Sequence, residues 1–141
     1  MTLEIPEQIR QDLHTYLEAA YPEEGVGLLL GMVDGDHRSV GRLLKLTNRR
    51  EDEARHNRYL LSPQDYMHGE QEADRLGLDL LGIFHSHPDH PNRPSDFDRQ
   101  WAMPWFIYLI TSVQQGKAEE SRAWTLSEDH AQFIEEKIIW R

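Results

Sequence analysis

The chain has 141 residues, of which 38% are hydrophobic and 28% charged, and it includes four Trp, five Tyr and four Phe. This length and aromatic content are typical of one globular domain with a single core, here expected over 1–141. The formal net charge of −10 argues against a nucleic-acid partner, because clustered Lys and Arg hold a phosphate backbone. The chain has no cysteine, so disulfides and thiolate metal ligands are excluded, and His and carboxylates must hold any metal.

The N-terminal segment favours a cytoplasmic protein. Residues 1–10 lack the basic stretch followed by an apolar run that marks a secretory signal. No stretch of the sequence approaches the 18 consecutive apolar residues expected of a transmembrane helix. We therefore expect a cytoplasmic protein without a membrane partner.

The first third of the sequence predicts a helix followed by a hairpin. Apolar residues three and four positions apart indicate one helical face over 6–20, and proline suits the first turn of that helix. The nearly continuous apolar run over 25–33 predicts a buried strand. Asp34-Gly35 is a turn signal that joins this strand to a second one over 39–46.

The middle of the chain predicts a loop, a helix and a second buried strand. The polar segment 48–57 is typical of a surface loop, and 58–61 predicts a short strand. A capping box with proline at the first helical position then predicts a helix over 62–76, which ends at Gly77. The apolar run over 78–84 predicts a buried strand.

The last third predicts a helix from Ser95, strands over 105–113 and 121–126 with a turn near Gly116, and a closing helix over 128–139. Helices alternate with buried strands along the whole chain. This alternation predicts an α/β layered domain with a mostly covered, mixed sheet.

Residue types that bind metal gather between positions 85 and 98. His85 and His87 follow the predicted strand, where residues i and i+2 point to one side, so both imidazoles can converge on one ion. Asp98 lies one turn into the next helix, and the proline-rich loop between allows a tight reversal. Two imidazoles and a carboxylate suit Zn²⁺ and leave its fourth position for water, as in catalytic sites. The pattern predicts one zinc ion per chain.

Glu24 is the candidate general base for such a site. It precedes the first buried strand, where Gly25 and Gly27 allow other backbone to approach closely. Zinc lowers the pKa of its water towards about 7, and a nearby carboxylate can take the proton and pass it to a leaving amine. Glu23 is the competing acid at this position.

The motif residues and their spacing resemble the JAMM (MPN-plus) zinc metalloprotease family, in its compact prokaryotic form. That motif is Glu, then His-x-His, then seven residues, then Ser-x-x-Asp. Segments such as PEEGVGLLLG, SPQDY, GIFHSHPDHPNRPSDFD and WFIYLITSV extend the resemblance over most of the chain. The motif residues in this sequence are Glu24, His85, His87, Ser95 and Asp98, with every spacing kept.

The resemblance implies a three-layer α/β/α, cytidine-deaminase-like MPN fold with a mixed, curved sheet. It implies hydrolysis of a peptide or isopeptide bond after the C-terminal glycine of a ubiquitin-like or sulfur-carrier protein, whose tail is expected to bind as an added strand. It selects Glu24 over Glu23 as the base and implies that Ser95 holds the oxyanion. The released product (amino acid, peptide or protein) and the oligomeric state stay open.

Several alternatives accompany this interpretation. Ser95 and Asp98 also fit a helix capping box, which competes with metal binding by Asp98. His90 fits a solvated loop residue better than a ligand, and Trp101 and Trp105 fit core packing better than substrate contact. A non-catalytic MPN scaffold is a second functional hypothesis, which the intact motif counts against. A small-molecule zinc deaminase is disfavoured because such enzymes use Cys ligands.

Overall fold

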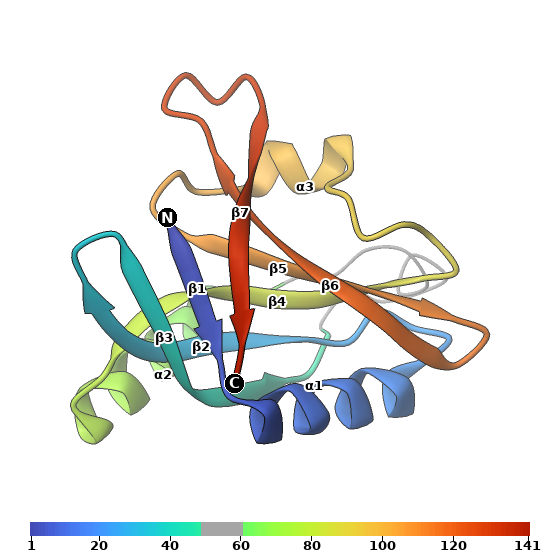
Figure 1. Ribbon diagram of the computed structural model, residues 1–141, viewed down its shortest axis with the longest axis horizontal. Coiled ribbons are helices and arrows are strands. Elements are labelled where there is room, and N and C mark those ends of the chain that lie inside the picture. The colour runs from blue at the N-terminus through green and yellow to red at the C-terminus, as the bar shows by residue number, and fades with distance from the viewer. Residues whose placement is uncertain (49–60) are drawn as a thin grey trace.

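A computed structural model describes residues 1–48 and 61–141, which form one α/β fold (Figure 1). The described residues form seven strands and three helices. The elements in chain order are β1 (Thr2–Ile5), α1 (Glu7–Ala20), β2 (Val26–Asp34), β3 (His37–Leu46), α2 (Pro63–Leu76), β4 (Asp79–Pro88), α3 (Asp96–Trp101), β5 (Ile107–Gln114), β6 (Lys117–Leu126) and β7 (Phe133–Trp140).

The strands form one mixed sheet in the order β1-β3-β2-β4-β5-β6-β7, which closes into a barrel because β7 pairs with β1. β1 runs parallel to β3 and β7, and β4 runs parallel to β5, whereas the other neighbours are antiparallel. Helix α1 lies along one side of the barrel against β3 and β6, and α2 packs on β2 and β4 (Figure 1). The prediction of an α/β domain with a mixed sheet is confirmed.

The best-marked sequence signals gave the most accurate element boundaries. In the capping box of α2, Asp65 N donates to Ser62 Oγ at 3.2 Å and Ser62 N donates to Asp65 Oδ2 at 2.8 Å. Gly77 ends this helix in the left-handed conformation, with φ of 69°. Helix α1 and the β2–β3 hairpin also lie where the sequence predicts them. The predicted loop over 48–57 and strand over 58–61 fall outside the described residues except for Asn48 and Leu61.

The predicted closing helix over 128–139 is wrong, because this segment contains strand β7. β7 is antiparallel to β6 and parallel to β1. β1 has four residues, and no strand was predicted there. Glu136 of β7 accepts hydrogen bonds from Thr125 Oγ1 at 2.6 Å and from the amino group of Met1 at 3.2 Å. Pairing between the two ends of the chain therefore decides the conformation of this segment.

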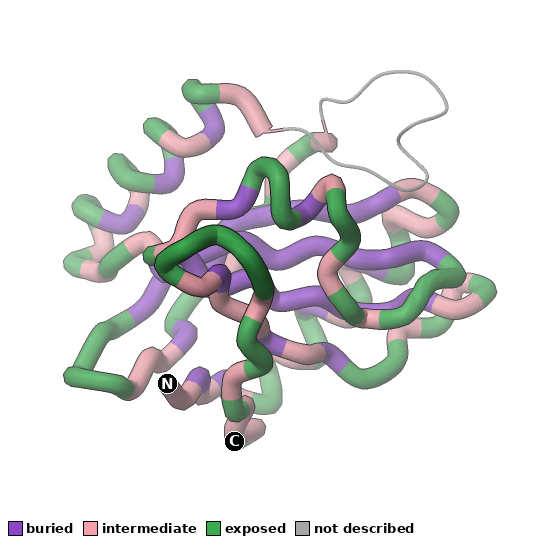
Figure 2. The backbone as a smooth tube through the Cα atoms, turned by 90° about the horizontal axis from the view of Figure 1, so that it is seen from above, coloured by how far each residue is buried: buried purple, intermediate pink, exposed green. Residues whose placement is uncertain are grey.

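Both faces of the sheet are buried, which accounts for the continuous apolar runs in its central strands. Along β5, Ile107 and Leu109 join one hydrophobic cluster, which also holds residues of α1, while Tyr108 between them joins a second cluster. Figure 2 shows the buried residues concentrated along the central strands and the exposed residues in the surrounding turns and loops. Among the described helices, none has both the length and the apolar character that crossing a bilayer requires.

Replacing Gly82 by alanine is expected to lower the free energy of unfolding by about 2 kcal/mol or more, as overpacking typically does. A Cβ on Gly82 would lie 1.9 Å from the carbonyl oxygen of Ile107, where β4 and β5 pair. Gly41→Ala is the matched control, because its Cβ would meet only ordinary contacts from 3.8 Å outwards. Urea unfolding of the two variants measures the difference, and equal stabilities would contradict this account of the β4–β5 contact.

Candidate metal centre

Strand β4 carries both motif histidines at its C-terminal end. His85 and His87 lie opposite Ile110 and Ser112 of β5, and His85 also lies opposite Val26 at the start of β2. Their ring centroids are 5.1 Å apart, and their residues are 0% and 8% exposed. The predicted convergence of the two imidazoles is present, inside the protein and not on its surface.

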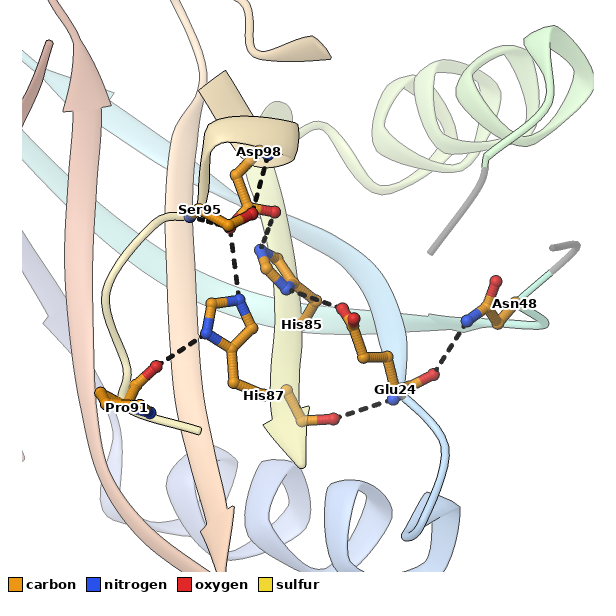
Figure 3. Close-up of polar contacts among 9 residues, drawn as sticks. Glu24, Asn48, His85, His87, Pro91, Ser95 and Asp98 are labelled. Atoms are coloured by element: carbon orange, nitrogen blue, oxygen red, sulfur yellow. Dashed lines mark hydrogen bonds and ion pairs between the residues drawn. The ribbon is translucent and has the colours of Figure 1, made fainter. Parts of the chain in front are cut away.

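Helix α3 brings Asp98 to the same point. Asp98 Oδ2 lies 3.3 Å from His87 Nε2, and Asp98 Oδ1 lies 3.8 Å from His85 Nε2, so both imidazoles direct Nε2 towards one buried carboxylate (Figure 3). The loop between His87 and α3 reverses the chain, as the prolines predicted. Asp98 thus lies beside both imidazoles.

Asp98 also completes the capping box at the start of α3. Asp98 N donates to Ser95 Oγ at 3.1 Å, and Ser95 N donates to Asp98 Oδ2 at 2.7 Å. The capping alternative is therefore confirmed, but it does not exclude a ligand role. An ionised carboxylate offers about four lone-pair sites on two oxygens. Oδ2 accepts the capping hydrogen bond while Oδ1 faces His85.

Glu24 lies on the other side of His85. It is 3% exposed, and its Oε1 is 3.4 Å from His85 Nδ1 (Figure 3). Its Oε2 is buried and has no hydrogen-bond partner among the described residues. Glu23 is only half-buried and lies outside the cluster. The sequence-based preference for Glu24 thus agrees with the position of its carboxylate beside the histidines.

Two carboxylates therefore border the histidine pair. One potential ligand atom each from Glu24, His85 and His87 lie within 4.8 Å of one another, and Asp98 is not part of this group. The two nitrogens of His85 face different acids, Nδ1 towards Glu24 and Nε2 towards Asp98. Imidazole nitrogen and carboxylate oxygen are suitable donors for Zn²⁺, and the buried Glu24 Oε2 lacks a hydrogen-bond partner in the described part of the chain. The residues present fit a zinc ion.

A backbone contact fixes the orientation of His87. Its Nδ1 lies 2.7 Å from the carbonyl oxygen of Pro91, which can only accept, so Nδ1 carries the hydrogen. In the neutral ring, the lone pair is then on Nε2, the nitrogen that faces Asp98. Metal-binding histidines usually have such a partner on the second nitrogen.

The electrostatics of the site favour a cation. Burial lowers the pKa of His87, but the hydrogen bond and charge of Asp98 outweigh burial and leave this pKa raised. Burial raises the pKa of Asp98, while the charges of His85 and His87 and the hydrogen bond from His87 lower it more strongly. Asp98 is thus held as a carboxylate beside the two imidazoles.

The site opens into a cavity of about 460 Å³. Ser95 lines this cavity, as the oxyanion role requires, and so does His90, whose residue is exposed and outside the ligand cluster. The interpretation of Trp101 and Trp105 as core residues is wrong, because they are 66% and 72% exposed. The cavity is lined by Glu24, His87, Pro88, His90, Pro91, Arg93, Ser95, Asp96 and Phe97.

Sequence reasoning missed the residues that position Glu24. Ser86, between the histidines, points to the opposite side of β4, and its Oγ accepts from Gly25 N at 2.9 Å. Asn48 Nδ2 donates to the carbonyl oxygen of Glu24 at 3.3 Å. A hydroxyl in an otherwise apolar buried strand was the available signal for Ser86, since a buried polar group needs a partner. No local signal identified Asn48 as a partner of Glu24.

Replacing Ser86 by alanine is expected to destabilise the protein by about 1–3 kcal/mol, because the buried Gly25 N–H loses its acceptor. The variant should also lose about 10-fold in any hydrolytic turnover, since the backbone that carries Glu24 is no longer fixed. Ser121→Ala is the control: Ser121 is equally buried, but its hydroxyl pairs with Thr111 at 2.6 Å. Thermal melts and kcat are measured for both. A kcat loss of the same size in Ser121→Ala would contradict a positioning role for Ser86.

Residues 6–127 match the family described as prokaryotic homologs of the JAB domain. The chain belongs to this family. It is 32% identical over 117 residues to a probable TtuB-protein conjugate cleaving protease of Thermus thermophilus, an alignment that covers 81% of this chain and 74% of that protein. It is also 32% identical over 79 residues to a desampylase of Pyrococcus furiosus, covering 56% of this chain and 54% of that protein. The JAMM-type resemblance is thereby confirmed.

Solved structures confirm the fold of this JAB-domain protein. A protein from Desulfitobacterium hafniense is 30% identical, with a TM-score of 0.85 over 99% of this chain and 92% of that one. A protein from Salinibacter ruber is 41% identical, with a TM-score of 0.76 over 98% and 91%. A JAB1/MPN domain protein from Archaeoglobus fulgidus, 17% identical, has a TM-score of 0.58 over 96% and 98%, which shows the shared fold alone.

Proposed function

We propose that this protein is a zinc-dependent peptidase or isopeptidase that cleaves after the C-terminal glycine of a ubiquitin-like or sulfur-carrier protein. The observation that carries the proposal is the buried pair of His85 and His87, which has the carboxylate of Glu24 on one side and that of Asp98 on the other. The relatives support the substrate class, since one is a probable protease of TtuB-protein conjugates and another a desampylase.

In the proposed site, His85, His87 and Asp98 hold the zinc ion and Glu24 acts on protons. A bound zinc ion acidifies water and polarises a carbonyl group. Asp98 suits the ligand role because its carboxylate faces both Nε2 atoms. Glu24 suits the base role because one of its oxygens has no hydrogen-bond partner among the described residues and its residue lines the cavity. Glu24 accepts a proton from water and gives it to the leaving amine.

Ser95 is proposed to donate to the oxyanion. Its Oγ accepts the hydrogen bond from Asp98 N with one lone pair, which leaves the hydroxyl hydrogen available to the cavity that Ser95 lines. The capping bond fixes the position of this hydroxyl before substrate arrives. Loss of such a donor typically costs about 10²–10³-fold in kcat.

The glycine tail of the carrier is proposed to bind along the end of β4. β2 pairs with β4 as far as His85, and Ser86 N then donates to Gly25 O at 3.1 Å, whereas β4 continues to Pro88 beside β5. The described residues therefore place no strand beside the last part of β4 on the β2 side. An extended tail gains main-chain hydrogen bonds at such a strand edge, and glycines allow it to approach the zinc ligands closely.

The test combines metal analysis with a cleavage assay. We expect one zinc ion per chain and hydrolysis of a carrier protein that is extended past its terminal Gly-Gly, with activity lost on chelation and restored by zinc. The products are resolved by mass, which identifies the bond that is cut. If the protein binds zinc but cuts none of the extended or conjugated carriers, it is a scaffold and the proposal is wrong.

A further inference from the structure

The loop between β4 and α3 is tied to its surroundings along most of its length. Each residue from 89 to 92 makes a hydrogen bond to another part of the chain through its backbone or side chain. The backbone that leads to Arg93 is therefore held in place. The bonds run from Gln115 N to Asp89 Oδ1 (2.8 Å), from Tyr21 Oη to Asp89 Oδ2 (2.7 Å), from Ser112 Oγ to His90 O (2.6 Å), from His87 Nδ1 to Pro91 O (2.7 Å), from Trp124 Nε1 to Asn92 O (3.1 Å) and from Asn92 Nδ2 to Glu120 O (2.6 Å).

Arg93 is the next residue of this loop and lines the cavity of the metal centre. It is exposed, and it makes no ion pair with any residue in 1–48 or 61–141. Among the acidic residues that line the cavity, Asp96 is the nearest to Arg93 in the sequence. Its side chain is 97% exposed and lies 3.9 Å from Arg99. A cationic residue on a backbone that is held in place thus lines the cavity of a chain whose net charge is −10.

The chemistry of the proposed substrate limits what this guanidinium can meet. On the acyl side of the scissile bond, the tail is glycine main chain and carries no charge. On the leaving side, a single amino acid carries an α-carboxylate two bonds from the scissile nitrogen. A lysine side chain in an isopeptide bond has no carboxylate at that distance. Only an amino-acid leaving group places an anion beside the bond that is cut.

We propose that Arg93 is a specificity-determining residue that pairs with the α-carboxylate of a leaving amino acid. The substrate is then a carrier protein extended past its C-terminal glycine by one residue with a free carboxylate. Water adds to the glycyl carbonyl carbon, the C–N bond breaks, and the amine takes up a proton, which gives a carrier with a free C-terminal glycine and a free amino acid. The guanidinium suits this role because it can bind a carboxylate in a bidentate, charge-assisted manner. This inference rests on the proposed function.

Two substrates that differ only at the C-terminus provide the test. One is a carrier protein that ends in Gly-Gly-Ala with a free carboxylate, and the other is the same protein with a C-terminal carboxamide. For the zinc-loaded wild type, we expect kcat/KM to be about 10-fold or more higher for the carboxylate, the size expected for a hydrogen bond to a charged group. Arg93→Gln should remove this preference by raising KM for the carboxylate substrate only.

Two further variants separate recognition from a general charge effect. Arg93→Lys keeps the charge and should retain part of the preference. Arg99→Gln removes an exposed arginine of α3 that pairs with Asp96 and is absent from the cavity lining, and it should keep the full preference. The wild-type preference should also shrink as salt is raised, because the pair is accessible to solvent.

Three results would overturn the inference. One is equal kcat/KM of the wild type for the two C-termini, and another is a preference that survives in Arg93→Gln. The third is an isopeptide-linked carrier that is cut as fast as the carboxylate substrate. In each case hydrolysis itself still occurs, so the proposed function stands. Failure to cut any of these substrates would overturn the proposed function and this inference together.

Discussion

Replacing Glu24 by glutamine is expected to lower kcat by about 10²–10⁴-fold, the usual contribution of a general base or acid, while zinc stays bound. Glutamine has nearly the same shape as glutamate, so it fits a position that is 3% exposed. Its amide cannot accept the proton of the attacking water or return it to the leaving amine. The side chains of Ser86 and Asn48 hold this segment through the main-chain atoms of Gly25 and Glu24. These hydrogen bonds do not involve the Glu24 side chain and therefore persist in the variant.

Glu23→Gln is the matched control for this experiment. It removes the same charge from the adjacent residue, which is half-buried and outside the histidine cluster, and it should retain nearly full activity. Both variants are assayed for kcat on an extended carrier, zinc content and thermal stability. Equal turnover in wild type and Glu24→Gln would rule out Glu24 as the base. A loss of zinc in Glu24→Gln would make it a ligand instead.

Much of the fold was predictable because its signals are local. The capping box at Ser62 and Asp65 and the left-handed Gly77 mark both ends of α2 within a few residues. The prediction failed where the structure depends on distant partners. The segment over 128–139 has apolar residues that fit a helical face, yet β7 pairs with β6 on one side and with the N-terminal β1 on the other. Local periodicity carries no information about such long-range pairing.

The clustering of the candidate site residues was predictable from motif spacing, but their individual contacts were not. Strand alternation placed His85 and His87 on one side, and the same alternation turns Ser86 towards Gly25. The sequence treated capping and metal binding by Asp98 as competing roles. In the structure the same carboxylate does both, because Oδ2 accepts the capping hydrogen bond and faces His87 while Oδ1 faces His85. The exposure of Trp101 and Trp105 was not predictable, since an aromatic residue near a site fits a core as well as a surface.

The chain also contains its own control for replacing Asp98, because α2 and α3 begin with equivalent capping boxes. Asp65 and Asp98 are both buried, and each accepts a hydrogen bond from the serine three residues before it. Among the residues of 1–48 and 61–141, Asp98 is the one of the two that has ion-pair contacts to histidines. Replacing either aspartate by asparagine keeps an oxygen for the cap, so loss of capping should cost no more than about 1 kcal/mol in each variant.

Asp98→Asn is expected to weaken zinc binding by about 100-fold or more and to abolish hydrolysis at limiting zinc. Even the outer partners of zinc ligands contribute 10–100-fold to affinity, and an amide oxygen is a poorer ligand than a carboxylate. Asp65→Asn should bind zinc like the wild type. Zinc affinity is measured by competition with a chelator, alongside Glu24→Gln. If Asp98→Asn keeps its zinc and Glu24→Gln loses it, then the ligands are Glu24, His85 and His87, whose ligand atoms lie within 4.8 Å of one another, and the two acids exchange roles.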